Sequence, residues 1–361
     1  MNILSLSSYN YTLPKECIAT EPITPKEAAK LLVFNRKDCI ITHSTFRNFA
    51  NFLPKDTLLV FNNTKVLPAR IYGKKILQNL KNDSNLCGAK IEALFHKEIS
   101  ENRYLMQFKG RLKAGSIISF GSVYARILGN LANIGIGFKE AEFFILKENK
   151  EIPLSRDAFF AFLEHSGHIP LPPYIKRDDT QADKQDYQSV FAKHLGAIAA
   201  PTASLHFSKE AYKYLKEHFS TTEITLHTGA GTFLGVNTEN ILEHKMHTES
   251  FFIPQDSAKK MKVASHITAI GTTAARTIET YARSEAFKEG KALSGECDLF
   301  LHPQNPPKAT SALLTNFHLP KTTLLMLVAS FIGLEQTLKL YQEAIAKNYR
   351  FYSYGDGMLI L

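Results

Sequence analysis

Glycine-bounded loops at the ends of predicted strands are the first candidates for chemistry. Residues 225–233 read TLHTGAGTF and place His227, Gly229 and Gly231 at the end of an apolar run. Glycines there let backbone N–H groups approach a ligand closely. The segment is neither a G-x-G-x-x-G fingerprint nor a P-loop. On its own, a plain loop explains it equally well.

A second segment, residues 269–277, reads AIGTTAART and predicts a strand that feeds directly into a helix. Gly271, Thr272 and Thr273 would lie at the helix N-terminus, where free N–H groups and the helix dipole favour an anionic ligand. The alternative is that one threonine simply caps the helix. Arg276, one turn further on, is either a ligand-binding residue or an ordinary surface residue.

Three further segments carry groups able to move protons. HKMHTE supplies His247 and Glu249, TNFHLP supplies Asn316 and His318, and SYGDGM places Asp356 between two glycines. Polar loops on a rigid apolar scaffold are common places for active sites, and His, Glu and Asp are the usual general acids and bases. A structural histidine and a simple turn remain alternatives for the last two segments.

A metal site is not predicted. His165 and His168 form one H-x-x-H pair and His244 and His247 another, but neither pair has an evident third ligand. The four cysteines are scattered, without a C-x-x-C pair, which fits a reducing compartment. No secretion signal is recognisable at the N-terminus, so the sequence predicts a cytoplasmic protein.

The charge balance suits a polyanionic partner. Lysine and arginine number 43 against 34 acidic residues, giving a net charge of +9. Lys65, Arg70, Lys176 and Arg177 lie beside prolines and Tyr174, a combination suited to RNA, although a solvated charged face also explains it. The longest apolar run, residues 324–334, is shorter than the ~20 residues of a membrane helix and predicts a buried helix instead.

The sequence predicts two domains that position these residues, and the length of 361 residues agrees with that number. Residues 72–150 contain closely spaced β-rich runs, typical of a small barrel or sandwich. Strands and helices alternate after residue 151. We therefore expect an α/β main domain formed by residues 1–71 and 151–361, with an inserted all-β, barrel-like domain of residues 72–150.

The ordered blocks resemble one known family. VFNNTKVLPARI, HIPLPPYIKR, APTASLHF, TLHTGAGTF, HKMHTE, AIGTTAART, LLTNFHLPKTTLLMLV and YRFYSYGDGMLIL resemble the S-adenosylmethionine:tRNA ribosyltransferase-isomerase family of the queuosine pathway. The resemblance runs from about Leu13 to the C-terminus. Two stretches depart from the family pattern. PKEAAK (residues 25–30) replaces an Arg-Asp-x-Ser-Arg-like block, and LHPQN (residues 301–305) replaces a Tyr-Pro-Gly-aromatic turn.

The resemblance implies a reaction in which S-adenosylmethionine donates its ribosyl moiety to 7-aminomethyl-7-deazaguanine at the tRNA wobble position. Epoxyqueuosine-tRNA forms, and adenine and methionine leave without help from a metal. The expected acid–base residues are His247, Glu249, His318 and Asp356. The expected donor-pocket residues are His227, Gly229, Gly231, Gly271, Thr272, Thr273, Arg276 and Asn316. The anticodon arm is expected to meet Lys65, Arg70, Lys176 and Arg177.

Two other functions stay open on the sequence. An S-adenosylmethionine-dependent RNA methyltransferase would use the same cosubstrate, but the expected G-x-G loop after the first strand is not evident. A non-catalytic RNA-binding protein would explain the basic excess alone, though not the His, Glu and Asp residues in glycine-bounded loops. We expect a monomer with no membrane segment, and released adenine would separate the three functions.

Overall fold

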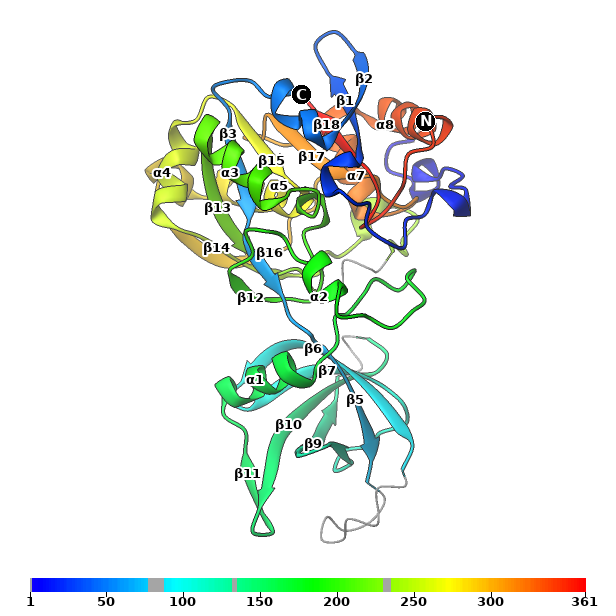
Figure 1. Ribbon diagram of the computed structural model, residues 1–361, viewed down its shortest axis with the longest axis vertical. Coiled ribbons are helices and arrows are strands. Elements are labelled where there is room, and N and C mark those ends of the chain that lie inside the picture. The colour runs from blue at the N-terminus through cyan, green and yellow to red at the C-terminus, as the bar shows by residue number, and fades with distance from the viewer. Residues whose placement is uncertain (1, 77–87, 132–134, 230–234) are drawn as a thin grey trace. The chain divides into compact units, whose positions relative to one another are not determined.

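The computed structural model describes residues 2–76, 88–131, 135–229 and 235–361, which form two compact units (Figure 1). The larger unit comprises Met1–Lys65, Pro172–Lys176 and Gln185–Leu361, and the smaller comprises Val66–Leu171 and Arg177–Lys184. The larger is built of a mixed sheet with helices and the smaller of a closed barrel. The predicted fold class, an α/β domain with an inserted all-β domain, is confirmed.

A nine-stranded sheet forms the centre of the larger unit. Across the sheet the strands are β16 (Leu293–Cys297), β14 (Glu249–Ile253), β13 (Ser220–Leu226), β3 (Leu58–Asn62), β15 (Ile267–Ile270), β17 (Ala312–Asn316), β18 (Gly357–Ile360), β1 (Lys30–Asn35) and β2 (Ile40–Thr45). The central strands β13, β3, β15 and β17 are parallel, and β18 is antiparallel to β17. The carboxyl ends of four strands and the first residue of β18 therefore meet at one edge.

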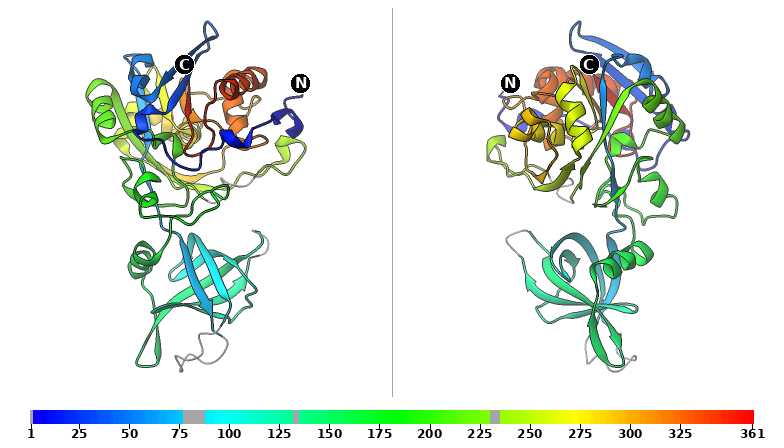
Figure 2. Two further views of the ribbon diagram at one scale, coloured as in Figure 1. Left: turned by 45° about the vertical axis from the view of Figure 1, so that its right-hand side comes forward. Right: turned by 90° about the vertical axis from the view of Figure 1, so that its left-hand side faces the viewer.

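Strands β3, β15 and β17 are buried along their whole length because helices cover both faces of the sheet (Figure 2). The α-helices are α2 (Asp183–Asp186), α3 (Lys209–His218), α4 (Gln255–Val263), α5 (Thr272–Ala282), α6 (Glu285–Glu289), α7 (Thr323–Ile332) and α8 (Leu334–Ala346). Helices α4, α5, α7 and α8 pack on one face, and α3 packs on the other. Short 3-10 helices include Leu6–Tyr9, Lys15–Cys17, Lys26–Ala28, Phe46–Phe52, Thr202–Ser204 and Ile241–Glu243.

Helix α7 is the apolar run predicted to be a buried helix. The Thr322 hydroxyl accepts the Leu325 N–H and so caps its N-terminus. Gly333, at a φ of +79°, separates α7 from α8, and the two helices are bent by 111°. Within the described ranges no single helix is long and apolar enough to cross a membrane, and only this bent pair passes the same test together.

The smaller unit is a six-stranded antiparallel barrel with one extra strand. Its elements are β5 (Arg70–Lys75), β6 (Lys90–Ser100), β7 (Arg103–Lys109), β8 (Ile117–Phe120), β9 (Val123–Asn130), β10 (Phe138–Lys147), β11 (Lys150–Pro153) and α1 (Arg156–Ser166). Strand β10 pairs with both β7 and β9, which closes the barrel. The ring of Phe159 in α1 stacks on that of Tyr104 in β7, with 3.8 Å between the ring centroids, so the helix packs on the barrel.

A two-stranded sheet completes the secondary structure. Strands β4 (Thr64–Val66) and β12 (His194–Ala197) pair outside the large sheet. Strand β4 follows the end of β3 directly, and Asn62 Nδ2 donates to the carbonyl of Leu226 in the neighbouring β13. The chain is thus fixed at the point where it leaves the central strand.

Candidate active site

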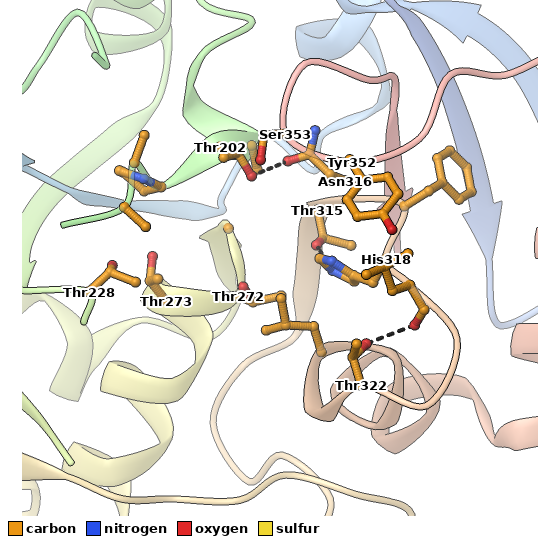
Figure 3. A pocket seen from close by; sticks show the side chains of 18 of the residues that line it. Thr202, Thr228, Thr272, Thr273, Thr315, Asn316, His318, Thr322, Tyr352 and Ser353 are labelled. Atoms are coloured by element: carbon orange, nitrogen blue, oxygen red, sulfur yellow. Dashed lines mark hydrogen bonds between the residues drawn. The ribbon is translucent and has the colours of Figure 1, made fainter. Parts of the chain in front are cut away.

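A pocket of about 470 Å³ lies where β13, β15 and β17 end and β18 begins (Figure 3). Thr228 comes from the end of β13, Gly271 from the end of β15 and Asn316 from the end of β17, while Ser353 precedes β18. Ligands of open α/β sheets bind at such strand ends. Segments far apart in the sequence therefore form one pocket, which we call the strand-end pocket.

The loop between β17 and α7 supplies His318 to the pocket. The Nε2 atom of His318 lies 2.8 Å from the hydroxyl of Thr315. Burial lowers the pKa of His318 to about 3, so the imidazole is neutral at physiological pH. Asn316 is fixed from the side because the Thr202 hydroxyl donates to its Oδ1 at 2.8 Å.

His206 is a neighbour of Asn316 that the sequence analysis missed. Its Nε2 lies 3.3 Å from Nδ2 of Asn316, and its ring stacks on that of Phe46 with 3.9 Å between the ring centroids. Burial lowers the pKa of His206 to about 3. The APTASLHF block that contains it was recognised only as part of the family resemblance, because a histidine between apolar residues carries no distinctive chemical signal.

Two tyrosines from the segment after residue 172 also line the pocket. The backbone N–H of Ser353 donates to the Tyr174 hydroxyl at 3.0 Å, and the Tyr174 ring lies 4.1 Å from that of Tyr352. Tyr174, considered for RNA stacking on the sequence, is therefore a wall of the pocket. The Thr228 hydroxyl is buried and has no hydrogen-bond partner among the described residues, whereas the Tyr187 hydroxyl has the backbone of Ala200 and the side chain of Ser353 as hydrogen-bonding neighbours.

The junction of β15 and α5 confirms part of the predicted geometry. Gly271 has a φ of +96°, which a residue with a side chain rarely adopts, and it is itself the N-cap of α5. The alternative interpretation, a threonine N-cap, is therefore wrong. Thr272 and Thr273 both line the strand-end pocket, and Asn62 Nδ2 donates to the Thr273 hydroxyl at 3.2 Å.

A second, smaller pocket of about 40 Å³ contains three other predicted residues, His247, Glu249 and Arg276. Leu324 lines both pockets. Glu249 and Arg276 form a buried ion pair, and Glu249 Oε1 also accepts the backbone N–H of Gly229 at 3.0 Å. The pair thus fixes the backbone of Gly229, which follows β13.

The guanidinium of Arg276 is largely engaged by the protein. Its Nε donates to the carbonyl of Leu299 at 3.1 Å, and its Nη2 donates to the carbonyl of Cys297 at 3.2 Å. Together with Glu249, these acceptors hold the side chain across the end of β16. The role of Arg276 as a donor-pocket residue stays a prediction.

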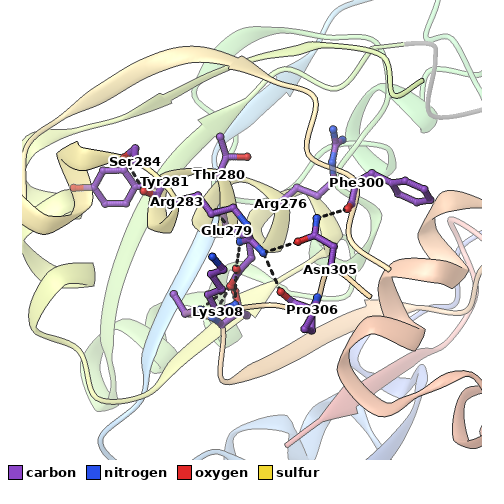
Figure 4. Close-up of polar contacts among 12 residues, drawn as sticks. Arg276, Glu279, Thr280, Tyr281, Arg283, Ser284, Phe300, Asn305, Pro306 and Lys308 are labelled. Carbon is purple, nitrogen blue, oxygen red and sulfur yellow. Dashed lines mark hydrogen bonds and ion pairs between the residues drawn. The ribbon is translucent and has the colours of Figure 1, made fainter. Parts of the chain in front are cut away.

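Glu279 of α5 and Arg283, which directly follows α5, anchor the LHPQN segment (Figure 4). The buried Glu279 carboxylate pairs with Arg283 and accepts backbone N–H groups of residues 308–310. Asn305 accepts from Arg283 Nη2 at 3.3 Å and donates to the carbonyl of Phe300 at 2.8 Å. An asparagine side chain therefore stabilises the turn where the family resemblance led us to expect glycine, and Phe300 is held as a wall of the smaller pocket.

Asp356 is buried at the start of β18 and does not line either pocket. Its Oδ1 accepts the N–H of Lys30 and its Oδ2 that of Arg350, each at 2.7 Å. Burial raises the pKa of Asp356, against the lowering effect of these two N–H groups. The carboxylate thus ties β1 to the loop that carries Tyr352 and Ser353.

His227 lies beside the strand-end pocket, directly before Thr228. Its Nδ1 is 2.8 Å from the Thr64 hydroxyl, and burial lowers the pKa of its imidazole. Gly196 of β12 leaves the space for this ring, because a Cβ there would lie 2.6 Å from Nδ1. Gly231, also predicted for the donor pocket, lies outside the described residues.

The four predicted RNA-binding residues divide between the units. Lys65 and Lys176 belong to the larger unit, and Arg70 and Arg177 to the smaller. Arg177 forms a bidentate pair with Asp183 at 2.6 and 2.9 Å, and Arg70 lies 3.4 Å from Glu92. Across the part of the chain that is described, no group of three His, Cys, Asp or Glu residues could hold a metal ion.

Comparison with known proteins identifies the family of this chain. Residues 6–360 match a family described as queuosine biosynthesis protein, and the chain belongs to that family. A protein named S-adenosylmethionine:tRNA ribosyltransferase-isomerase from Campylobacter jejuni is 51% identical over 99% of both chains. One of the same name from Helicobacter pylori is 48% identical over the full length of both.

A solved structure agrees with these relatives. It is titled S-adenosylmethionine tRNA ribosyltransferase from Thermotoga maritima, with 30% identity and a TM-score of 0.53. The match covers 98% of this chain and all of that one. The family resemblance drawn from the sequence blocks is confirmed.

Proposed function

We propose that this enzyme transfers and isomerises the ribosyl moiety of S-adenosylmethionine onto 7-aminomethyl-7-deazaguanine at the wobble position of tRNA. Epoxyqueuosine-tRNA is formed, and adenine and methionine are released. Identity of about 50% over the full length with relatives named for this activity supports the proposal. The substrate tRNA carries its modified base in the anticodon arm, and the enzyme acts as a cytoplasmic monomer.

The single observation that carries the site assignment is the strand-end pocket. Its volume lies within the range of about 300 to 1,000 Å³ typical of small-molecule sites. Buried polar groups normally find partners, so the Thr228 hydroxyl, which has none among the described residues, indicates a polar ligand. A nucleoside-type donor such as S-adenosylmethionine offers ribose hydroxyls and an amine that would satisfy it.

In the proposed reaction a base acts first, by removing a proton from the donor, and an acid acts later. The positive sulfur of the donor acidifies the adjacent 5′ protons, so a neutral side chain can remove one without a metal. His318 is the predicted acid–base residue that lines the donor pocket. Because Thr315 engages Nε2, we assign proton removal to Nδ1.

The other predicted acid–base residues lie around this pocket. His247 and Glu249 line the adjoining smaller pocket, where His247 is the candidate proton donor to the departing adenine. Glu249, paired with Arg276, orients the backbone N–H of Gly229. Asp356 positions the loop with Tyr352 and Ser353 through backbone hydrogen bonds. Lys65, Arg70, Lys176 and Arg177 remain our candidates for contacts with the anticodon arm.

The test is mass spectrometry of one incubation with S-adenosylmethionine and an anticodon stem–loop bearing 7-aminomethyl-7-deazaguanine. We expect epoxyqueuosine in the RNA, with adenine and methionine released in equal amounts. Methylated RNA with S-adenosylhomocysteine would instead identify the alternative methyltransferase. Unchanged RNA that is nevertheless bound would favour a non-catalytic RNA-binding protein.

Replacing Thr228 by Val should weaken donor binding without destabilising the fold. Its hydroxyl has no partner within the described residues, so its loss removes a hydrogen bond to the donor only, worth about 0.5–1.5 kcal/mol or roughly 2- to 13-fold in affinity. The measurements are the KM for S-adenosylmethionine and the thermal midpoint. Thr42→Val, on an exposed side chain of β2, is the control. An unchanged KM with a lowered midpoint would assign the hydroxyl to the fold.

A further inference from the structure

A groove on the barrel unit is lined by five cationic side chains. It has a volume of about 760 Å³ and is distinct from the two pockets of the larger unit. The cations are Lys75, Lys109, Arg111, Lys113 and Lys139. The described residues that line it include no Asp or Glu. This basic groove is not accounted for by the chemistry assigned to the strand-end pocket.

The groove is formed where three strands of the barrel and one loop converge. Lys75 ends β5, Lys109 ends β7, and Arg111 and Lys113 lie in the loop that follows β7. Lys139 lies near the start of β10. The backbones approach closely here, since a Cβ on Gly137 would lie 2.7 Å from the carbonyl oxygen of Phe108. Lys75, Lys109 and Lys139 are therefore held on barrel strands, and Arg111 and Lys113 lie on the loop between β7 and β8.

Three of the cations face solvent. Lys109, Arg111 and Lys113 are exposed, the side chain of Lys109 by 77%. Lys109 pairs with Glu92 at 2.9 Å, but Glu92 also lies 3.4 Å from Arg70 and cannot neutralise the groove. Exposed ion pairs of this kind contribute about 0–1 kcal/mol, so a phosphate can replace Glu92 as the partner of Lys109.

A single small anion does not account for this arrangement. Lys139, the buried cation of the groove, is bonded to Asn130, and Lys75 donates to the carbonyl of Arg111 at 3.3 Å. The remaining positive charge is spread over exposed, flexible side chains, as in surfaces that follow a nucleic-acid backbone. Such side chains release condensed counterions when they meet successive phosphates.

We propose that the basic groove binds the sugar–phosphate backbone of the tRNA substrate. This inference rests on the proposed function and adds to it a second RNA-binding surface on the barrel. Contacts to phosphates position RNA without reading its sequence. The groove therefore contributes to the affinity for tRNA and not to the choice of the base or to the chemical step.

The test compares two triple variants of equal charge. The groove variant is Lys109→Gln, Arg111→Gln and Lys113→Gln, and the control is Lys97→Gln, Lys147→Gln and Lys150→Gln, all exposed barrel residues outside the groove. We expect the groove variant to raise the Kd for full-length tRNA about 10-fold at moderate salt. The slope of log Kd against log salt should fall by about 2 to 3, since each phosphate that is no longer neutralised lowers it by roughly 0.7–0.9.

Catalytic parameters distinguish this inference from the proposed function. In the groove variant kcat at saturating tRNA and the KM for S-adenosylmethionine should equal those of the wild type. Equal salt slopes in the groove variant, the control and the wild type would overturn the inference, while wild-type product would still uphold the proposed function. If the triple variant folds poorly, the single changes Arg111→Gln and Lys113→Gln serve instead. Each should lower the slope by about 1, and unchanged slopes would overturn the inference.

Discussion

Replacing His318 by Gln should lower kcat by about 100-fold or more. General-base catalysis contributes roughly 10²–10⁴ in rate, and a base of low pKa lies toward the lower end of that range. Burial lowers the pKa of His318 to about 3, which keeps the imidazole unprotonated but makes it a weak base. The rate of adenine release under single-turnover conditions is the measurement that isolates this step.

The pair His318→Gln and His318→Asn separates base catalysis from hydrogen bonding. The Gln side chain can reproduce the contact of Nε2 with Thr315, and Asn can reproduce a contact made by Nδ1. Both variants should be equally slow if Nδ1 removes a proton. A Gln variant with wild-type kcat would show that His318 is not the base. His218→Gln, on the exposed end of α3, is the matched control.

The pH dependence follows from the same lowered pKa. The neutral form of His318 predominates above about pH 4, and it is lost only as the pH falls through about 3. The plot of kcat/KM against pH should therefore have no acid limb from His318 between about pH 5 and 8. An acid limb near pH 6.5 that vanishes in His318→Gln would contradict a buried, neutral base.

Much of the fold was predictable because the sequence patterns are local. The continuous apolar run of β3 and the glycine between β15 and α5 indicate buried strands and a strand–helix junction without knowledge of distant neighbours. Closure of the barrel depends instead on the pairing of β10 with both β7 and β9. Likewise, no local pattern indicates that α1 packs on the barrel through Phe159.

For the candidate site, the sequence indicates which residues gather at one edge of the sheet but not what they contact. Parallel strands bring their carboxyl ends to one edge, so polar residues after successive strands meet there. What those residues contact depends on partners far away in the chain. The carboxylate of Glu249 is occupied by Arg276, and Tyr187 lines a pocket that its sequence context, DKQDYQSV, does not suggest.

The Asp356→Asn variant best distinguishes a positioning role of this carboxylate from a direct role in the chemical step. Both carboxylate oxygens accept backbone N–H groups, so the amide must turn its own NH₂ toward the N–H of either Lys30 or Arg350. One hydrogen bond to a charged acceptor is removed and a buried donor is left unpaired, at a cost of about 1.5–3 kcal/mol in unfolding free energy. The anchoring of the loop with Tyr352 and Ser353 at the donor pocket is then weakened.

Turnover by Asp356→Asn should therefore fall strongly, by about 10- to 100-fold, with a raised KM for S-adenosylmethionine and a nearly unchanged Kd for tRNA. A misplacement of about 1 Å in a catalytic loop can cost on the order of 100-fold in rate. Denaturant unfolding, donor KM and tRNA Kd are the measurements, and Asp256→Asn, exposed in the first turn of α4, is the control. Wild-type stability together with abolished turnover would instead place the Asp356 carboxylate in the chemical step, because the loss of turnover would then not come from a loosened fold.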